Sequence, residues 1–190
     1  MIRKTLFIIL MLSLFSACDS GSNRNINENT DSQMYALVND LFYKQYSNQL
    51  SQFSDVLISL TKESVNDEML SYLNGRIEGG ASFTRSVLYS LEKTESSVVD
   101  KAIPPELRPS LFSILAETED ILDRLNQFIK EKDLRKVEEN KILILEVVQL
   151  CDEINVAENV IKDESYFKEY DEKLIQTLGE LRRLELRLKQ

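Results

Sequence analysis

The chain has 190 residues, of which 43% are hydrophobic and 29% charged, with a formal net charge of −9 and no histidine. This length and composition suit a domain with an apolar core and exclude a collagen-like or wholly disordered chain. The acidic charge argues against nucleic-acid binding, and the lack of histidine excludes His-ligated metal or haem sites and Ser-His or Cys-His catalysis.

The N-terminus carries the clearest motif. Arg3 and Lys4 precede an apolar run over residues 6–15. That run is shorter than the roughly 20 residues that span a bilayer, and it is typical of a secretory signal peptide. It ends in Leu14-Phe15-Ser16-Ala17-Cys18, which resembles the lipobox of bacterial lipoprotein precursors.

This resemblance implies that residues 1–17 are a signal peptide and that Cys18 is lipidated. The protein would then be anchored in a cell membrane by its N-terminal lipid, on the extracytoplasmic face. Residues 18–29 are rich in Ser, Gly and Asn, which predicts a flexible tether between the lipid and a helical domain at 30–190. Loss of two basic residues with the signal peptide would change the net charge from −9 to −11.

From Thr30 onward, apolar residues recur every three or four positions, which is typical of amphipathic helices. A capping-box pattern at Thr30 and Gln33 predicts the first helix start. The expected helices run from about 31 to 63, from 66 to 91, from the Pro104-Pro105 pair to 131, from Asp133 to 161 and from 163 to 188. The sequence therefore predicts an all-α fold, an elongated up-and-down bundle of four to five long amphipathic helices.

Two segments leave local alternatives open. Gly75, Gly79 and Gly80 predict a kink or a short break in the second helix, or else close approach by a neighbouring helix or a small ligand. The run at 142–148 is apolar on more than one face, which predicts the most central helix, although its β-branched residues also suit a strand. Cys151 on the same helix is expected to be a buried, inert thiol.

The residues offer no catalytic constellation. Acidic groups such as Glu117 and Asp120 share helical faces, but their pattern favours a solvated surface over a metal site. No nucleophile, base and orienting group can be assembled from these residue types, so we expect no enzyme activity, no metal and no cofactor.

Two kinds of binding site remain. Aromatic residues cluster on the first and last helices, where they form either plain core or a ligand pocket near the glycines. The residues of that pocket would be Tyr43, Tyr46, Tyr166, Tyr170, Gly79 and Gly80.

The second kind is a protein-binding surface. Ile175, Leu186, Phe112 and Ile129 do not fit the inward stripes, so they either widen the core or form a patch for a partner helix. Ile175 and Leu186 are the candidate surface. The expected function is a lipid-anchored interaction, accessory or sensing module of the cell envelope that binds a protein partner or self-associates; the alternative is a small-ligand receptor.

Overall fold

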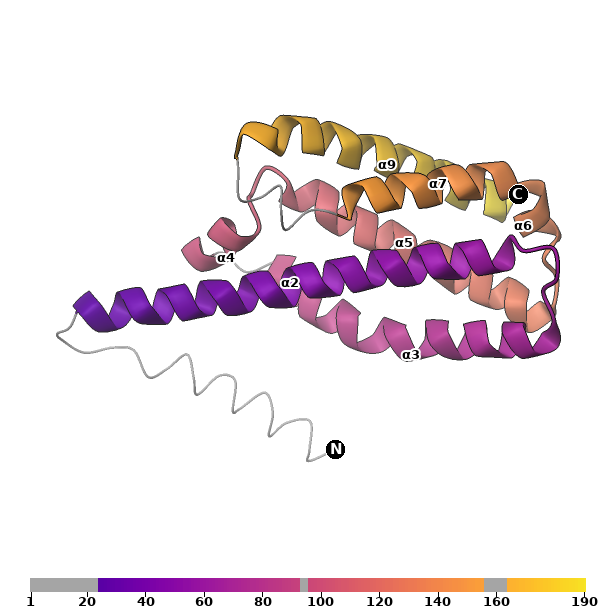
Figure 1. Cartoon of the computed structure of the whole chain (residues 1–190), viewed down its shortest axis with the longest axis horizontal. Coiled ribbons are helices and arrows are strands. Elements are labelled where there is room, and N and C mark those ends of the chain that lie inside the picture. The colour runs from indigo at the N-terminus through magenta and orange to yellow at the C-terminus, as the bar shows by residue number, and fades with distance from the viewer. Residues whose placement is uncertain (1–23, 93–95, 156–163) are drawn as a thin grey trace, which may run out of the picture. The chain divides into compact units, whose positions relative to one another are not determined.

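A computed structural model describes residues 24–92, 96–155 and 164–190, and these residues are helical with no strand among them. The elements are α2 (Arg24–Leu60), α3 (Asp67–Glu92), α4 (Ser97–Ala102), α5 (Arg108–Glu131), α6 (Arg135–Glu139), α7 (Lys141–Ile154), the 3-10 turn η1 (Glu164–Tyr166) and α9 (Phe167–Lys189). They pack as an all-α helical bundle, which confirms the predicted fold class (Figure 1). The strand alternative for residues 142–148 is wrong, because they lie in α7.

The chain divides into two compact units, Met1–Gln33 and Met34–Gln190. Of the first unit, the structure describes only the first turns of α2. The second unit contains the rest of α2 and all the other elements named above.

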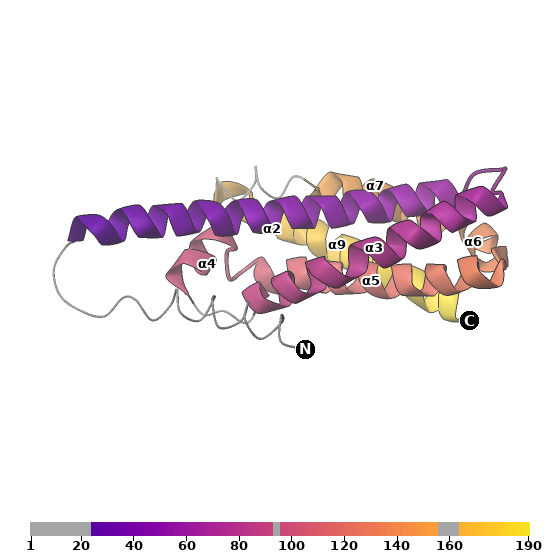
Figure 2. The same cartoon turned by 90° about the horizontal axis from the view of Figure 1, so that it is seen from below.

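Polar contacts within the second unit define how its helices run. Gln52 on α2 donates a hydrogen bond to the Arg76 carbonyl on α3, and Arg76 pairs with Asp55, so α2 and α3 lie side by side (Figure 2). On α5 and α9, Ser110 contacts Asp171 and Glu117 contacts Arg182, which makes these two helices parallel. In Figure 1, α2, α5 and α9 run one way while α3 and α7 return between them.

The widest buried face belongs to α2. Its buried side chains are Val38, Phe42, Tyr43, Tyr46, Gln49, Leu50, Phe53, Ser54, Val56, Leu57 and Leu60. The α2 helix contacts α3, α4 and α5 through side-chain hydrogen bonds from Gln52, Tyr43 and Gln49. A helix with neighbours on several sides needs an apolar face wider than a single stripe.

The prediction that the helix over 142–148 is the most central is therefore wrong. Ile144, Val147 and Cys151 are buried on α7, but Ile142 and Leu145 face solvent. The apolar run is continuous in sequence, whereas only one side of α7 faces the core. Leu150, which the sequence places on the inward stripe, is only half-buried.

Three helix boundaries differ from those expected. The third predicted helix begins at Arg108 and not at the Pro104-Pro105 pair. The α2 helix begins at Arg24, so it includes residues 24–29 of the predicted tether, and Thr30 lies inside the helix rather than at its cap. The predicted fourth helix is divided into α6 and α7 at Asn140. Its expected last turns, at 156–161, lie outside the described residues.

The three glycines of the second helix do not divide it, because α3 is continuous from Asp67 to Glu92. A Cβ atom added at Gly75 or Gly79 would meet no other atom within 4 Å. Close approach by a neighbouring helix therefore does not require glycine at either of these two positions. The side-chain surroundings of Gly80 lie outside the described part of the structure.

Candidate functional site

A groove lies between the start of α7 and the end of α9. Its volume is about 450 Å³. One wall comes from α6 and α7 and the other from α9, and the lining residues are Glu138, Glu139, Asn140, Lys141, Ile142, Leu143, Glu146, Arg183 and Arg187. We call this the α7–α9 groove.

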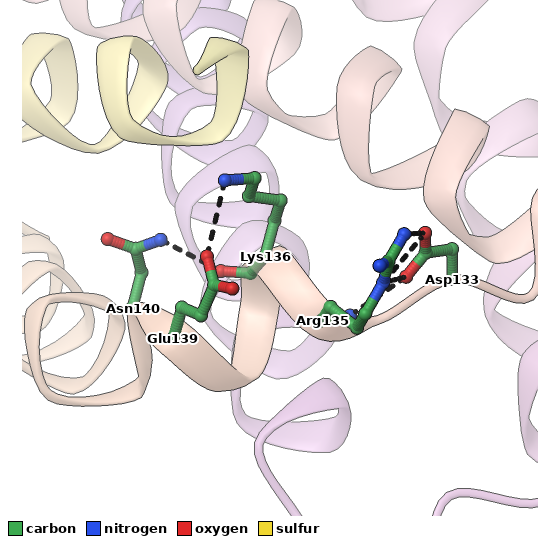
Figure 3. A network of polar contacts seen from close by, with 5 residues as sticks. All are labelled: Asp133, Arg135, Lys136, Glu139 and Asn140. Carbon is green, nitrogen blue, oxygen red and sulfur yellow. Dashed lines mark hydrogen bonds and ion pairs between the residues drawn. The ribbon is translucent and has the colours of Figure 1, made fainter.

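The break between α6 and α7 shapes the first wall. Asp133 accepts hydrogen bonds from the backbone N–H and the guanidinium of Arg135 at the start of α6 (Figure 3). These bonds lower the pKa of Asp133 to about 2. The α6 helix ends at its C-cap residue, Asn140. The side-chain amide of Asn140 donates a hydrogen bond to the Lys136 carbonyl at 2.9 Å, and the backbone carbonyl of Asn140 accepts one from Ile144 N at 2.9 Å.

Asn140 fits this junction because its side-chain amide can replace a backbone donor where a helix ends. Asn140 is both the C-cap residue of α6 and the N-cap residue of α7, and its backbone has φ −111° and ψ 13°. Lys136 and Glu139 form an ion pair at 3.2 Å on α6 (Figure 3). The junction thus places Glu139, Asn140 and Lys141 together at one end of the groove.

The second wall is one side of α9. Leu181, Leu184 and Leu188 point into the core, and the adjacent positions Arg183 and Arg187 face the groove. This arrangement follows from the helical period, since residues three and four apart share a face. Arg183 is paired with Glu180 on its own helix at 3.0 Å.

Opposite charges line the two walls. The α6–α7 wall carries Glu138, Glu139 and Glu146 as well as Lys141, whereas the α9 wall carries two arginines. Among the residues that the structure describes, no ion pair of 4.0 Å or less joins these walls, and none is formed by Glu138, Lys141, Glu146 or Arg187. All four of these side chains are exposed to solvent.

Large apolar side chains are exposed in and beside this charged groove. Ile142 is 86% exposed at the start of α7, and it is a lining residue of the groove. On α9, Leu186 is 56% exposed next to Arg187, and Ile175 is 57% exposed three turns earlier. Because eleven residues make about three helical turns, Ile175 and Leu186 lie on the same side of α9.

The other two residues that did not fit the predicted stripes are in the core. Phe112 and Ile129 on α5 are both buried. The Phe112 ring lies 5.5 Å from that of Phe42 on α2, measured between ring centroids. The sequence left open whether the four residues outside the predicted stripes widen the core or form an exposed patch. Phe112 and Ile129 belong to the core, whereas Ile175 and Leu186 are exposed.

The structure brings together only part of the predicted ligand pocket. Tyr43, Tyr46 and Tyr170 are all buried, whereas Tyr166 is exposed on η1. Gly79 is exposed on α3, with nothing near its added Cβ, so it does not border the buried tyrosines. Nothing can be said of Gly80, whose surroundings are not described.

The buried tyrosines behave as core residues, and two of them have hydrogen-bonded hydroxyls, whereas the buried Tyr46 hydroxyl has no hydrogen-bond partner among the described residues. The Tyr43 hydroxyl donates to the Ala102 carbonyl at 2.7 Å, and the Tyr170 hydroxyl donates to the Ile154 carbonyl at 2.6 Å. Rings of Phe42 and Tyr46 stack with centroids 5.9 Å apart. Burial raises the pKa of both Tyr46 and Tyr170 above the ordinary value for tyrosine.

Cys151 on α7 is a free, buried cysteine. Burial raises the pKa of its thiol to about 12, with a smaller contribution from Asp152. A thiol with such a pKa is almost wholly protonated near neutral pH, and the thiolate is the reactive form. Cys151 therefore has the properties of a structural residue.

Some predicted features fall partly or wholly outside the described residues. Cys18 lies outside the described residues, so its surroundings are not seen. Within the described ranges, no group of three or more Cys, Asp or Glu side chains is placed to hold a metal ion. No helix of the described segments is both long and apolar enough to cross a bilayer.

The sequence pattern missed the groove itself. Ile142 belongs to an apolar run that this pattern assigns to the most central helix, and the residues of the two walls are at least 37 positions apart in the sequence. One signal was present: Lys141 and Glu146 flank Ile142, and charged residues next to an isoleucine are typical of a helix face that leaves the core.

Comparisons of the chain with models of protein families, with curated proteins and with solved structures gave no significant match.

Proposed function

We propose that this chain is a lipid-anchored protein on the extracytoplasmic face of a bacterial cell membrane, where its helical bundle binds another protein. The motif that ends in Cys18 supports the anchor. The observation that carries the binding role is the exposure of Ile142 in a groove where four charged side chains, those of Glu138, Lys141, Glu146 and Arg187, have no ion-pair partner among the described residues.

An exposed isoleucine alone would carry little weight, because folded proteins expose many single apolar residues. Ile142 differs because it lies in a concave site, and Leu186 is exposed beside the arginine wall of that site. Apolar groups surrounded by polar residues in a groove are characteristic of protein–protein contacts. The α7–α9 groove therefore fits a protein partner.

The small-ligand alternative has less support. Tyr43, Tyr46 and Tyr170 pack in the core, and the hydroxyls of Tyr43 and Tyr170 bind backbone carbonyls. Gly79 is on the surface of a different helix. The residues that would have to share a pocket are thus divided between the core and the exterior.

Acylation tests the anchor. Cells that produce the native chain, Cys18→Ser or Cys151→Ser are labelled with a fatty-acid analogue, and the purified proteins are compared. We expect label in the native chain and in Cys151→Ser, which is the matched control, and none in Cys18→Ser. Equal labelling of all three chains would contradict the anchor.

Site-specific crosslinking in intact cells tests the binding role. A photoreactive residue replaces Ile142 in one chain and Tyr72 in a second chain, where Tyr72 is 63% exposed on α3. We expect a discrete crosslinked protein from position 142 and none from position 72. The same products from both positions, or none from either, would count against the groove as a binding site.

A further inference from the structure

We propose that the α7–α9 groove is an interface between two copies of this chain. This inference deepens the proposed function, on which it rests, because it names the partner as a second copy. It is argued from the charges of the groove, the placement of those charges on the two walls, and the apolar side chain between them.

The groove is electrically balanced in a strongly acidic protein. Its acidic residues are Glu138, Glu139 and Glu146, and its basic residues are Lys141, Arg183 and Arg187, so three charges of each sign cancel. The whole chain carries −9. Two copies therefore repel each other on average, and the groove is a region where that repulsion is locally removed.

The distribution of charge between the walls favours a two-fold arrangement. In such an interface the same patch is used by both copies, and when the two-fold axis runs along the groove, each wall of one copy meets the opposite wall of the other. The arginines of each α9 would then face Glu138 and Glu146 of the other copy. Glu138, Glu146 and Arg187, which have no ion-pair partner among the described residues of one chain, would gain partners in the pair.

Ile142 supplies the apolar centre of this interface. It lies between the acidic residues on the α6–α7 wall, and its 86% exposure leaves it free to be covered by a second copy. Burial of an exposed isoleucine is favourable, and opposite charges around it fix the orientation of the partner.

Sedimentation velocity of the full chain in a mild detergent tests the interface. We expect the native chain to dimerise reversibly, and Ile142→Asp to raise the dimer dissociation constant at least about tenfold. Tyr72→Asp is the control, since it places the same charge at an exposed apolar position on α3. Equal helical circular dichroism of all three chains checks that each is folded.

A pair of charge reversals tests the two-fold geometry. Arg187→Glu alone and Glu146→Arg alone each place like charges together and should weaken the dimer. An equimolar mixture should restore it, because in the mixed dimer one contact has both charges exchanged and the other is native. Restoration in the mixture is a result that a purely structural role of either residue would not give.

The interface is overturned if the native chain stays monomeric up to its solubility limit. It is also overturned if Ile142→Asp dimerises like the native chain, or if the mixture dissociates as readily as each charge variant alone. These results are separate from those that test the anchor and the crosslink. A monomeric chain that is still acylated at Cys18 and captures a different protein at position 142 retains the proposed function and loses only this inference.

Discussion

The buried face of α2 and the α7–α9 groove both contain large apolar side chains, but these side chains differ in their exposure to solvent. Phe53 and Leu57 on α2 are fully buried, whereas Ile142 on α7 is almost fully exposed. Both helices are amphipathic, and both carry apolar residues at helical spacing. The difference is that Phe53 and Leu57 lie on the side of α2 that faces other helices, whereas Ile142 lies on the side of α7 that faces solvent.

Their polar groups differ in the same way. On α2, the Gln49 side-chain amide donates to the Leu115 carbonyl at 2.8 Å and to Thr118 Oγ1 at 2.9 Å, all in the core. In the groove, Glu146 and Arg187 have no such partner among the described residues. Substitutions at α2 should therefore act on stability, and those in the groove on association.

The largest effect is expected for Phe53→Ala. Removal of a fully buried ring leaves a cavity, and such changes cost about 3–5 kcal/mol in the free energy of unfolding. The measurement is urea denaturation of the full chain followed by circular dichroism. Ile142→Ala serves as the comparison and should change that free energy by less than about 0.5 kcal/mol, as is usual for surface positions. An equal loss of unfolding free energy in Phe53→Ala and Ile142→Ala would contradict the distinction between a buried α2 face and an exposed groove.

A smaller loss is expected for Gln49→Leu, which removes two hydrogen bonds between α2 and α5. Buried acceptors left without a donor cost about 1–3 kcal/mol. The Thr118 hydroxyl also donates to the Leu115 carbonyl at 2.9 Å, so that carbonyl keeps one partner. In a double-mutant cycle, Gln49→Leu with Thr118→Val should cost less than the sum of the single changes, because the two side chains share one network. Strict additivity would show that the two side chains are not coupled.

Alkaline pH should destabilise the bundle through its core. The folded pKa of Cys151 is about 12, against an ordinary value of 9.0, and those of Tyr46 and Tyr170 are also raised. Between pH 9 and pH 12 the Cys151 thiol is deprotonated in the unfolded chain and still protonated in the folded chain. This contribution to the free energy of unfolding is therefore fully present below pH 9 and falls as the pH rises. The slope is about 1.4 kcal/mol per pH unit for each such group.

Chemical denaturation at pH 8, 9 and 10 measures this fall. Just above pH 9 the thiol is the first of the three groups to ionise in the unfolded chain, so Cys151→Ala should reduce the slope there. Val147→Ala, which truncates a buried side chain of α7 that cannot ionise, provides the control and should leave the slope unchanged. An unchanged slope in Cys151→Ala would mean that the thiol titrates alike in both states.

The helices were predictable because their pattern is local, but the depth of each residue was not. Ile175 and Phe112 both depart from the inward stripes of their helices, yet the structure exposes Ile175 and buries Phe112. The difference depends on what lies opposite: Phe112 meets Phe42 of α2, and Ile175 meets solvent. Periodicity gives the direction of a side chain on its own helix and not the number of neighbouring helices.

The α7–α9 groove could not be predicted from the sequence for a related reason. It depends on the break at Asn140 and on the meeting of residues 138–146 with Arg183 and Arg187. A single asparagine in a polar stretch does not by itself predict a junction between two helices. Asn140 ends α6 here because its side chain donates a hydrogen bond to the Lys136 carbonyl. The predicted surface residue Leu186 was nevertheless next to this site, because an apolar residue away from the inward stripe is visible in the sequence.

The smallest expected effect concerns a position that belongs to neither region. Gly79→Ala should raise the free energy of unfolding by about 0.5–1 kcal/mol, because alanine stabilises a helix interior relative to glycine. The added methyl group meets nothing within 4 Å, so no clash offsets this gain. Gly179→Ala on α9 has equally open surroundings and is the matched variant. Both are measured by urea denaturation, as for Phe53→Ala. A loss of stability at Gly79 with a gain at Gly179 would show that α3 has a close neighbour at this point, and would revive the ligand pocket that the sequence placed there.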